Sequence, residues 1–331
     1  MNAWLYERGL RPRLRVAAPV VSVGNLSAGG TGKTPMVAWL ARWFQEQGLQ
    51  PGIVSRGYKA AAQGTETNDE ARMLERELPG VPHEQDPNRV AGAQRLVELG
   101  VDVVLADDGF QHRRLVRDLD LVLVDAARPF GLPAANPDAA PVHAMLPRGL
   151  LREPLAALQR ADFVILTRSD AVSPERRDAL LAHLTKAAPG VPQLIARHAP
   201  TRLVDTAGVD LGLERLRELE LDLLTGVGNP EAVEETVREL GATLGSHRAR
   251  PDHHTWTAAD LEGLGQRPVL TTAKDRPKLE ALAQAANLEL WTLEVQLEFL
   301  GGEDKLLERL AGLPPADARR ERDAIHGGLH G

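Results

Sequence analysis

The sequence predicts an α/β protein with a parallel sheet and a second, smaller α/β domain. Apolar, strand-like runs alternate with helical patterns along most of the 331 residues, which is typical of parallel strands joined by right-handed helical crossovers. A glycine-rich stretch, SVGNLSAGGTGKTPM (22–36), separates the first such strand from its helix. A second strand–helix series begins near residue 219, after an irregular stretch at 190–218. We therefore expect domains at 1–198 and 199–331, joined by a hinge.

The elements follow from hydrophobic periodicity. In the first part we expect strands at 19–25, 51–58, 101–109, 119–127 and 161–170, and helices at 34–48, 69–78, 88–100 and 173–187. Ser173-Pro174 is a helix-start signal. In the second part we expect a strand and turn at 219–230, a helix at 231–241, a strand at 268–275, a helix from about Pro277 and a strand at 288–299.

Composition excludes several classes of protein. The net charge of −7 argues against a general nucleic-acid coat, and the absence of cysteine excludes disulfides and thiolate metal sites. No stretch approaches the roughly 18 apolar residues of a membrane span. The first 18 residues carry Arg8, Arg11, Arg13 and Arg15 behind Trp4, Leu5 and Tyr6. This segment is either a short membrane-contact anchor or a frayed basic terminus.

The glycine-rich stretch nearly matches the phosphate-binding loop G-x-x-x-x-G-K-[ST], in which backbone N–H groups surround phosphate oxygens. Ser27 replaces the first glycine, which is tolerable if its φ is negative, and Gly24 could take the tight turn instead. Ala28 argues against the partitioning-type ATPases, which have lysine there. The alternative is a glycine-rich strand–helix turn without a ligand. The candidate nucleotide-binding residues are Ser27, Ala28, Gly29, Gly30, Thr31, Gly32, Lys33 and Thr34.

Two carboxylates end the apolar strand VDVVLADDG (101–109). Asp107 and Asp108 stand where Mg²⁺ is held beside a phosphate loop, together with the Thr34 hydroxyl. The alternative is an acidic turn that caps the next helix. Gln111 and His112 follow at the same edge of the sheet.

Other polar residues have ordinary explanations on spacing alone. Asp69 and Glu70 open a helix, where acidic residues cap and favour the first turn. Arg89 follows Asp-Pro-Asn and could be a solvated helix residue. The Asp-His-His at 252–254 suggests an oriented imidazole in a polar loop.

Taken together, these segments resemble one family. The chain carries, in order, the motifs SVGNLSAGGTGKTP, SRGY (55–58), NDEA (68–71), DPNR (86–89), ADDGFQHRRL (106–115), LPRGLLREP (146–154), TGVGNP (225–230), PDHH (251–254) and TTAKD (271–275). This order is similar to that of the tetraacyldisaccharide 4′-kinases, the lipid A 4′-kinases, and the similarity covers about residues 19–300. The segments ADDGFQH and LREP are the more specific ones.

The resemblance implies a P-loop NTPase-like kinase that works at the cytoplasmic face of the inner membrane. Its phosphate donor is ATP with Mg²⁺, and its acceptor is the 4′-hydroxyl of an acylated glucosamine disaccharide 1-phosphate, so that lipid IVA forms. By resemblance, Lys33 and Thr34 hold the phosphates and Mg²⁺, Asp107 and Asp108 support the metal, and Asp69 is the base paired with His253. The remaining residues of the cleft by resemblance are Tyr58, Glu70, Arg89, Gln111, His112 and Glu153.

Three departures from the family pattern stand out. The longer N-terminal hydrophobic helix of the family is either missing here or reduced to the short basic segment, the loop at 132–145 is about ten residues longer, and Ala273 stands where the family has glutamate. Asp69 and His253 lie in different predicted domains, so we expect them to meet on domain closure, which would expel water. The competing hypothesis is another P-loop NTPase, a GTPase-like switch or a metal-chaperone NTPase, without a lipid acceptor.

Overall fold

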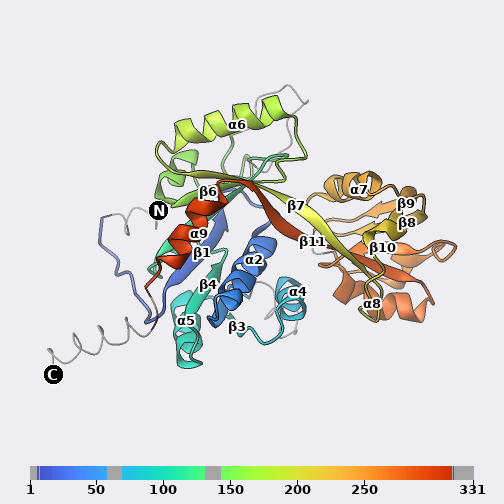
Figure 1. The fold of residues 1–331 in the computed structure, drawn as a ribbon, viewed down its shortest axis with the longest axis horizontal. Coiled ribbons are helices and arrows are strands. Elements are labelled where there is room, and N and C mark those ends of the chain that lie inside the picture. The colour runs from blue at the N-terminus through green and yellow to red at the C-terminus, as the bar shows by residue number, and fades with distance from the viewer. Residues whose placement is uncertain are drawn as a thin grey trace. The chain divides into compact units, whose positions relative to one another are not determined.

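The computed structural model describes residues 6, 8–57, 69–130, 143–252, 254–314 and 316. The chain groups into two compact units. Unit 1 contains Met1–Asn68, Leu74–Arg197 and Leu297–Gly331, and unit 2 contains Asp69–Met73 and His198–Gln296. The chain leaves unit 1 along β7 (Gln193–Val204) and returns along β11 (Leu290–Gly301), which are neighbours in the sheet (Figure 1). The limits 1–198 and 199–331 for independently folding domains stay a prediction.

Unit 1 is built on a parallel sheet with strand order β3-β2-β4-β1-β5-β6-β7. Its strands before β7 are β1 (Val20–Asn25), β2 (Pro51–Ser55), β3 (His83–Gln85), β4 (Val103–Asp107), β5 (Leu119–Asp125) and β6 (Phe163–Thr167). Strand β1 is central, and its Val23 pairs with Asp107 of β4 on one side and Leu121 of β5 on the other. Every residue of β1, β2, β4, β5 and β6 is buried, which explains why these strands read as continuous apolar runs.

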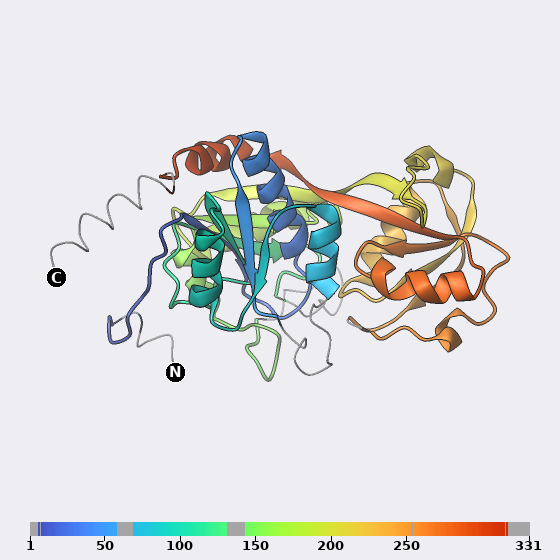
Figure 2. The same ribbon diagram turned by 90° about the horizontal axis from the view of Figure 1, so that it is seen from below.

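Helices cover both faces of this sheet. They are α2 (Lys33–Glu46), α4 (Asp69–Glu77), α5 (Arg89–Glu98), α6 (Pro174–Ala187) and α9 (Glu303–Ala311), with a short 3-10 helix η1 (Leu155–Arg160). Apolar residues of α2 and α9 pack on one face (Figure 1, Figure 2). Residues of α5 and α6 pack against strand residues that alternate with those of the first face. The predicted α/β class with a parallel sheet is confirmed, and the structure adds that helices cover both faces of the sheet.

In unit 2 the strand order of the same 11-stranded sheet continues as β11-β10-β8-β9, in which β10 (Val269–Thr272) and β8 (Glu220–Thr225) are central. Strand β9 (Thr243–Ala249) forms the edge, and β10 pairs in parallel with β11 and β8, as β8 does with β9. Helices α7 (Pro230–Glu239) and α8 (Arg276–Ala285) and the 3-10 turns η2 (Leu213–Leu216) and η3 (Ala258–Leu261) complete the unit. Asn229 caps α7 by accepting a hydrogen bond from the N–H of Ala232 at 3.3 Å.

Four of the strands and α-helices were not predicted: β3, β7, β9 and α9. Strands β3 and β9 contain no fully buried residue, and β7 is buried only in part, so none shows the apolar signal of the central strands. Helix α9 is short, and its apolar residues Leu306 and Leu310 become buried only against unit 1.

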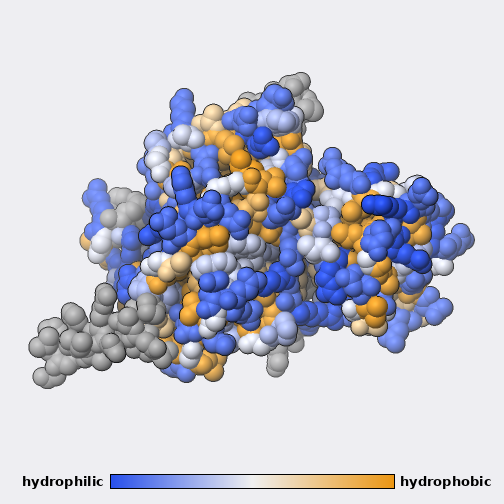
Figure 3. All heavy atoms as spheres, viewed as in Figure 1, coloured by the Kyte–Doolittle hydropathy of each residue, from blue (hydrophilic) through white to orange (hydrophobic). Residues whose placement is uncertain are grey.

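The surface in Figure 3 intersperses hydrophilic and hydrophobic side chains. Among the described residues, the exposed large hydrophobic side chains of the molecule are those of Leu10, Leu99, Met145, Leu146, Val209 and Leu300. None of the helices among the described residues combines the length and the hydrophobicity needed to cross a bilayer.

Candidate active site

The glycine-rich stretch forms a loop between the carboxyl end of β1 and the amino end of α2. Gly29 and Gly32 take positive φ values of 125° and 88°, which residues with side chains rarely adopt. Helix α2 has no capping side chain and no acidic residue in its first turn. Its first N–H groups and the positive end of its dipole are therefore available to an anion.

Ser27 and Gly24 clarify the departure from the motif. Ser27 is not among the described non-glycine residues with positive φ, so it needs no glycine. The alternative that Gly24 takes the tight turn is wrong, because Gly24 lies inside β1 without a positive φ. A Cβ there would lie 2.5 Å from Cβ of Phe110, so a glycine is needed for close approach of the chain after β4.

Positively charged side chains surround Asp108 beside the loop. Its carboxylate lies 3.6 Å from Nζ of Lys33 and accepts hydrogen bonds of 2.9 and 2.8 Å from Nη1 of Arg152. Burial raises the pKa of Asp108, but Lys33, Arg152 and Arg89 outweigh it, so the net pKa lies below the usual value. The carboxylate is therefore ionised at neutral pH and balances part of this positive charge.

Asp107 ends β4 and is 5% exposed. Together with Asp108 and the Thr34 hydroxyl it offers the hard oxygen donors that Mg²⁺ prefers. Among the described residues no group of three or more His, Cys, Asp or Glu side chains could hold a metal ion. The donor set thus fits a magnesium ion whose remaining ligands are phosphate oxygens and water.

Gln111, His112 and Arg89 lie around the same edge of the sheet. Gln111 donates from Nε2 to the carbonyl of Asn25 at 2.9 Å, which ties the segment after β4 to the end of β1. Burial, together with the cations Arg89, Arg117 and Arg114, lowers the pKa of His112 to about 4. Arg89 is 4% exposed, and its charge interacts with Asp108 and Asp107. The structure therefore brings His112, with a neutral imidazole at neutral pH, close to Arg89, and places Gln111 against the end of β1 and Arg152.

Glu153 is held by two arginines. Its Oε2 accepts hydrogen bonds from Nη2 of Arg113 at 2.8 Å and from Nη1 of Arg160 at 2.9 Å. The Arg160 guanidinium also lies 4.4 Å from the ring centroid of Phe110. These contacts brace the segments around the loop, and a role of Glu153 in substrate binding stays a prediction.

Two features of the site were missed by sequence reasoning. Leu26 and Ala28 form backbone hydrogen bonds of 2.7 Å with Arg152 and Leu150, so the LREP segment flanks the loop directly. On another side, Arg168 donates to the carbonyl of Gly30 at 3.0 Å. The quoted motif LPRGLLREP contains Arg152 and could have signalled it, whereas no motif pointed to Arg168.

Four predicted residues lie wholly or partly outside the described residues. They are Tyr58 and His253, and the side chains of Asp69 and Glu70. The backbone of Asp69 and Glu70 begins α4, as predicted. The predicted roles of all four residues stay predictions, and the longer loop at 132–145 also lies mostly outside the described residues.

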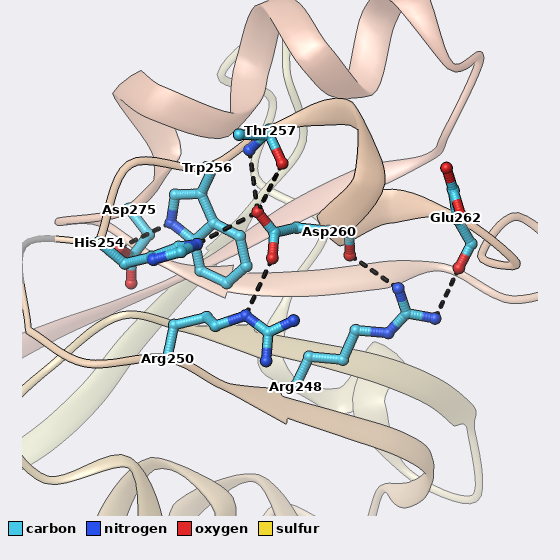
Figure 4. A network of polar contacts seen from close by, with 8 residues as sticks. All are labelled: Arg248, Arg250, His254, Trp256, Thr257, Asp260, Glu262 and Asp275. Atoms are coloured by element: carbon cyan, nitrogen blue, oxygen red, sulfur yellow. Dashed lines mark hydrogen bonds and ion pairs between the residues drawn. The ribbon is translucent and has the colours of Figure 1, made fainter.

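His254, the residue after His253 in the sequence, belongs to a polar network in unit 2 (Figure 4). Asp260 accepts hydrogen bonds from Arg250 at 2.9 Å and from the backbone and hydroxyl of Thr257 at 3.0 Å, and its Oδ2 lies 3.1 Å from Nε2 of His254. Burial raises the pKa of Asp260, but these hydrogen bonds outweigh burial, so that the pKa lies well below its usual range.

The TTAKD motif braces the same region. Asp275 is fully buried and accepts hydrogen bonds from the N–H of Gly226 at 2.8 Å and from Nε1 of Trp256 at 3.2 Å. Lys274 forms an ion pair of 2.7 Å with Asp252. The motif therefore supports the TGVGNP turn and the segment that carries PDHH, and Ala273 takes no part in these bonds.

Comparisons with known proteins agree along the chain. A family model described as tetraacyldisaccharide-1-P 4′-kinase matches residues 1–313. The tetraacyldisaccharide 4′-kinase of Anaeromyxobacter dehalogenans (strain 2CP-C) is 42% identical over 331 aligned residues, which cover 93% of this chain and 85% of that protein. The enzyme of the same name from Pelobacter propionicus is 34% identical over 306 residues, covering 85% of this chain and 80% of that protein.

A solved structure gives the same result. The crystal structure of the "apo" form of LpxK from Aquifex aeolicus in complex with ATP matches with a TM-score of 0.72 and 27% identity, covering 94% of this chain and 93% of that one. Fold, loop and motif order, together with these matches, establish that the chain belongs to the tetraacyldisaccharide-1-P 4′-kinase family.

Proposed function

We propose that this protein transfers the γ-phosphate of ATP to the 4′-hydroxyl of a tetraacyldisaccharide 1-phosphate, a step of lipid A biosynthesis that yields lipid IVA. The observation that carries the proposal is the phosphate loop in a chain that matches the kinase family over residues 1–313. The loop supplies the donor site, and family membership supplies the acceptor. A GTPase-like switch or a metal-chaperone NTPase would need no lipid acceptor, and the family match disfavours both.

The side chains at the loop suit phosphoryl transfer, which depends on positioning and on charge neutralisation. Lys33 would neutralise phosphate oxygens from the start of α2, and the N–H groups of Gly30 to Gly32 would bind them. Thr34, Asp107 and Asp108 would hold Mg²⁺, which supplies further neutralisation of phosphate charge when bound.

The acceptor hydroxyl needs a proton acceptor. We assign this role to Asp69, with His253 as its partner, on the basis of the NDEA and PDHH motifs. Exclusion of water by domain closure belongs to the same proposal. Residues 69–73 group with His198–Gln296 in unit 2, so closure is not needed to bring Asp69 and His253 into one unit.

We also propose that the protein works as a peripheral protein at the cytoplasmic face of the inner membrane, with the N-terminal basic segment as a contact. Arg8, Arg11, Arg13 and Arg15 are all exposed, but Arg15 also forms an ion pair of 2.8 Å with Asp118 of the folded unit. Exposed arginines near anionic lipid contribute about 1 kcal/mol each. Replacing the first three by glutamine should reduce co-sedimentation with anionic vesicles at low salt, and unchanged binding would remove the segment from membrane contact.

Transfer of labelled γ-phosphate tests the reaction directly. We expect incorporation into a defined tetraacyldisaccharide 1-phosphate in the presence of ATP and Mg²⁺, and no incorporation with an acceptor whose 4′-hydroxyl is blocked. Label that enters a protein or a small molecule but not the lipid would contradict the proposed acceptor.

A further inference from the structure

Three consecutive carbonyl groups of the phosphate loop are held by side chains. Nδ2 of Asn25 donates to the carbonyl of Gly29 at 3.3 Å. Nη1 of Arg168 donates to the carbonyl of Gly30 at 3.0 Å, and the hydroxyl of Thr167 donates to the carbonyl of Thr31 at 2.9 Å. The Thr167 hydroxyl also lies 3.4 Å from the carbonyl of Val124, so its shorter bond is the one to the loop.

These bonds fix the direction of the loop amides. In a trans peptide the C=O of one residue and the N–H of the next point in opposite directions. The carbonyls of Gly29, Gly30 and Thr31 face the three side chains, so the N–H groups of Gly30, Thr31 and Gly32 face the other way. Within the described part of the chain no carbonyl or side chain accepts a hydrogen bond from these three N–H groups.

The three donors are held in place, whereas the tip of the loop at Gly29 and Gly30 is exposed and not packed. Asn25 and Thr167 are fully buried, at 0% exposure. The Arg168 guanidinium forms a close ion pair with Asp125, whose side chain is 4% exposed. By contrast, a Cβ added to Gly29 or Gly30 would meet no atom within 4 Å. Packing therefore does not fix the loop tip, and the hydrogen bonds from Asn25 and the end of β6 do.

We propose that Asn25, Thr167 and Arg168 are positioning residues that turn the loop amides toward the nucleotide phosphates before the nucleotide binds. The inference rests on the proposed function for the identity of the ligand, a nucleoside triphosphate. Arg168 acts through the Gly30 carbonyl, because Asp125 already balances its charge. The binding site then needs no reorganisation of the backbone when the phosphates arrive, which lowers the cost of binding.

Thr167 gives the sharpest test, because two substitutions separate its hydroxyl from its volume. Thr167→Val removes the donor and keeps the shape, whereas Thr167→Ser keeps the donor. Affinities for ATP and for tripolyphosphate alone are measured by calorimetry on the full chain. We expect Thr167→Val to weaken both by the same factor, about fivefold to tenfold for one hydrogen bond, and Thr167→Ser to restore both.

Thr271→Val is the matched control. Thr271 is also fully buried, and its hydroxyl donates to the carbonyl of Leu224 at 3.0 Å in unit 2, which does not carry the loop. We expect it to lower the melting temperature about as much as Thr167→Val and to leave the tripolyphosphate affinity unchanged. A general loss of stability would weaken phosphate binding in both variants, and that result would overturn the inference.

The other outcomes are equally decisive. Wild-type tripolyphosphate affinity in Thr167→Val would overturn the inference, and so would a loss of ATP affinity alone, which indicates a contact with the nucleoside. If the wild-type protein binds neither ATP nor tripolyphosphate, the proposed function fails together with the inference, which distinguishes that failure from the others.

Discussion

Glu153→Gln should destabilise the protein through the two arginines that its carboxylate holds. The side chains of Glu153 and Arg113 are 14% and 7% exposed, and the Arg160 side chain is 26% exposed. Two unit charges about 4 Å apart interact by roughly 4 kcal/mol at an effective dielectric constant of 20. Breaking a buried pair from one side costs about 3–5 kcal/mol, and the glutamine oxygen still accepts hydrogen bonds. We therefore expect a loss of about 2–3 kcal/mol in the free energy of unfolding.

The effect should depend on pH in a defined direction. Burial raises the pKa of Glu153, but Arg160 and Arg113 outweigh it, so the folded-state pKa lies below the ordinary value of 4.5. A carboxylate with a lowered pKa contributes stability above its unfolded pKa and loses it as the pH falls through the folded pKa. The difference in unfolding free energy between wild type and Glu153→Gln should be full at pH 7 and should shrink below about pH 4.5.

Urea unfolding at several pH values measures this difference, and Glu298→Gln serves as the control. Glu298 pairs with Arg197 at 2.8 Å, but their side chains are 47% and 42% exposed, so the loss should stay below about 0.5 kcal/mol. Equal stability of Glu153→Gln and wild type at pH 7 would refute the reasoning. A raised KM for the lipid with unchanged stability would instead support a substrate role.

Three further predictions concern the site itself. Lys33→Ala should abolish ATP turnover and shift the melting temperature little, because its partner Asp108 keeps Arg152; circular dichroism and turnover are measured together. His112, with a pKa lowered to about 4, stays neutral while the unfolded histidine takes up a proton, so His112→Gln should lose less stability than wild type between pH 6.5 and 4. Asp69→Ala and His253→Ala should each reduce kcat strongly with little change in ATP affinity, and the double variant should be little worse; multiplicative losses would show independent action.

The sequence predicts those elements whose own residues show a clear hydrophobic pattern. β1, β4 and β5 are buried at every position and read as continuous apolar runs. β7 spans twelve residues, of which only four are fully buried, and its central part contains His198, Pro200 and Thr201. Such a strand takes its structure from its neighbours β6 and β11, so periodicity alone could not identify it.

The residues of the site also divide into those that the sequence predicts and those that it does not. The residues that would bind phosphate are contiguous, because a strand–loop–helix unit folds them locally. Apart from Asn25, which is four positions from Gly29, the residues that balance charge and fix the loop come from far along the chain: Arg152 lies 44 positions from Asp108, and Arg168 lies 138 positions from Gly30. Such contacts produce no regular spacing of residues along the sequence, because they depend on the order of strands in the sheet.

This division has a physical consequence for the phosphate loop. The loop brings a lysine and the positive end of a helix to one place, and without a phosphate these charges need a partner. Asp108 supplies it for Lys33, at a separation of 3.6 Å, and Arg152 shares the same carboxylate. Phosphate oxygens that bind Lys33 would replace Asp108 as its partner and leave more of the carboxylate for a metal ion. The long-range contacts therefore balance the charge of the loop before the nucleotide arrives, and the local motif determines what it binds.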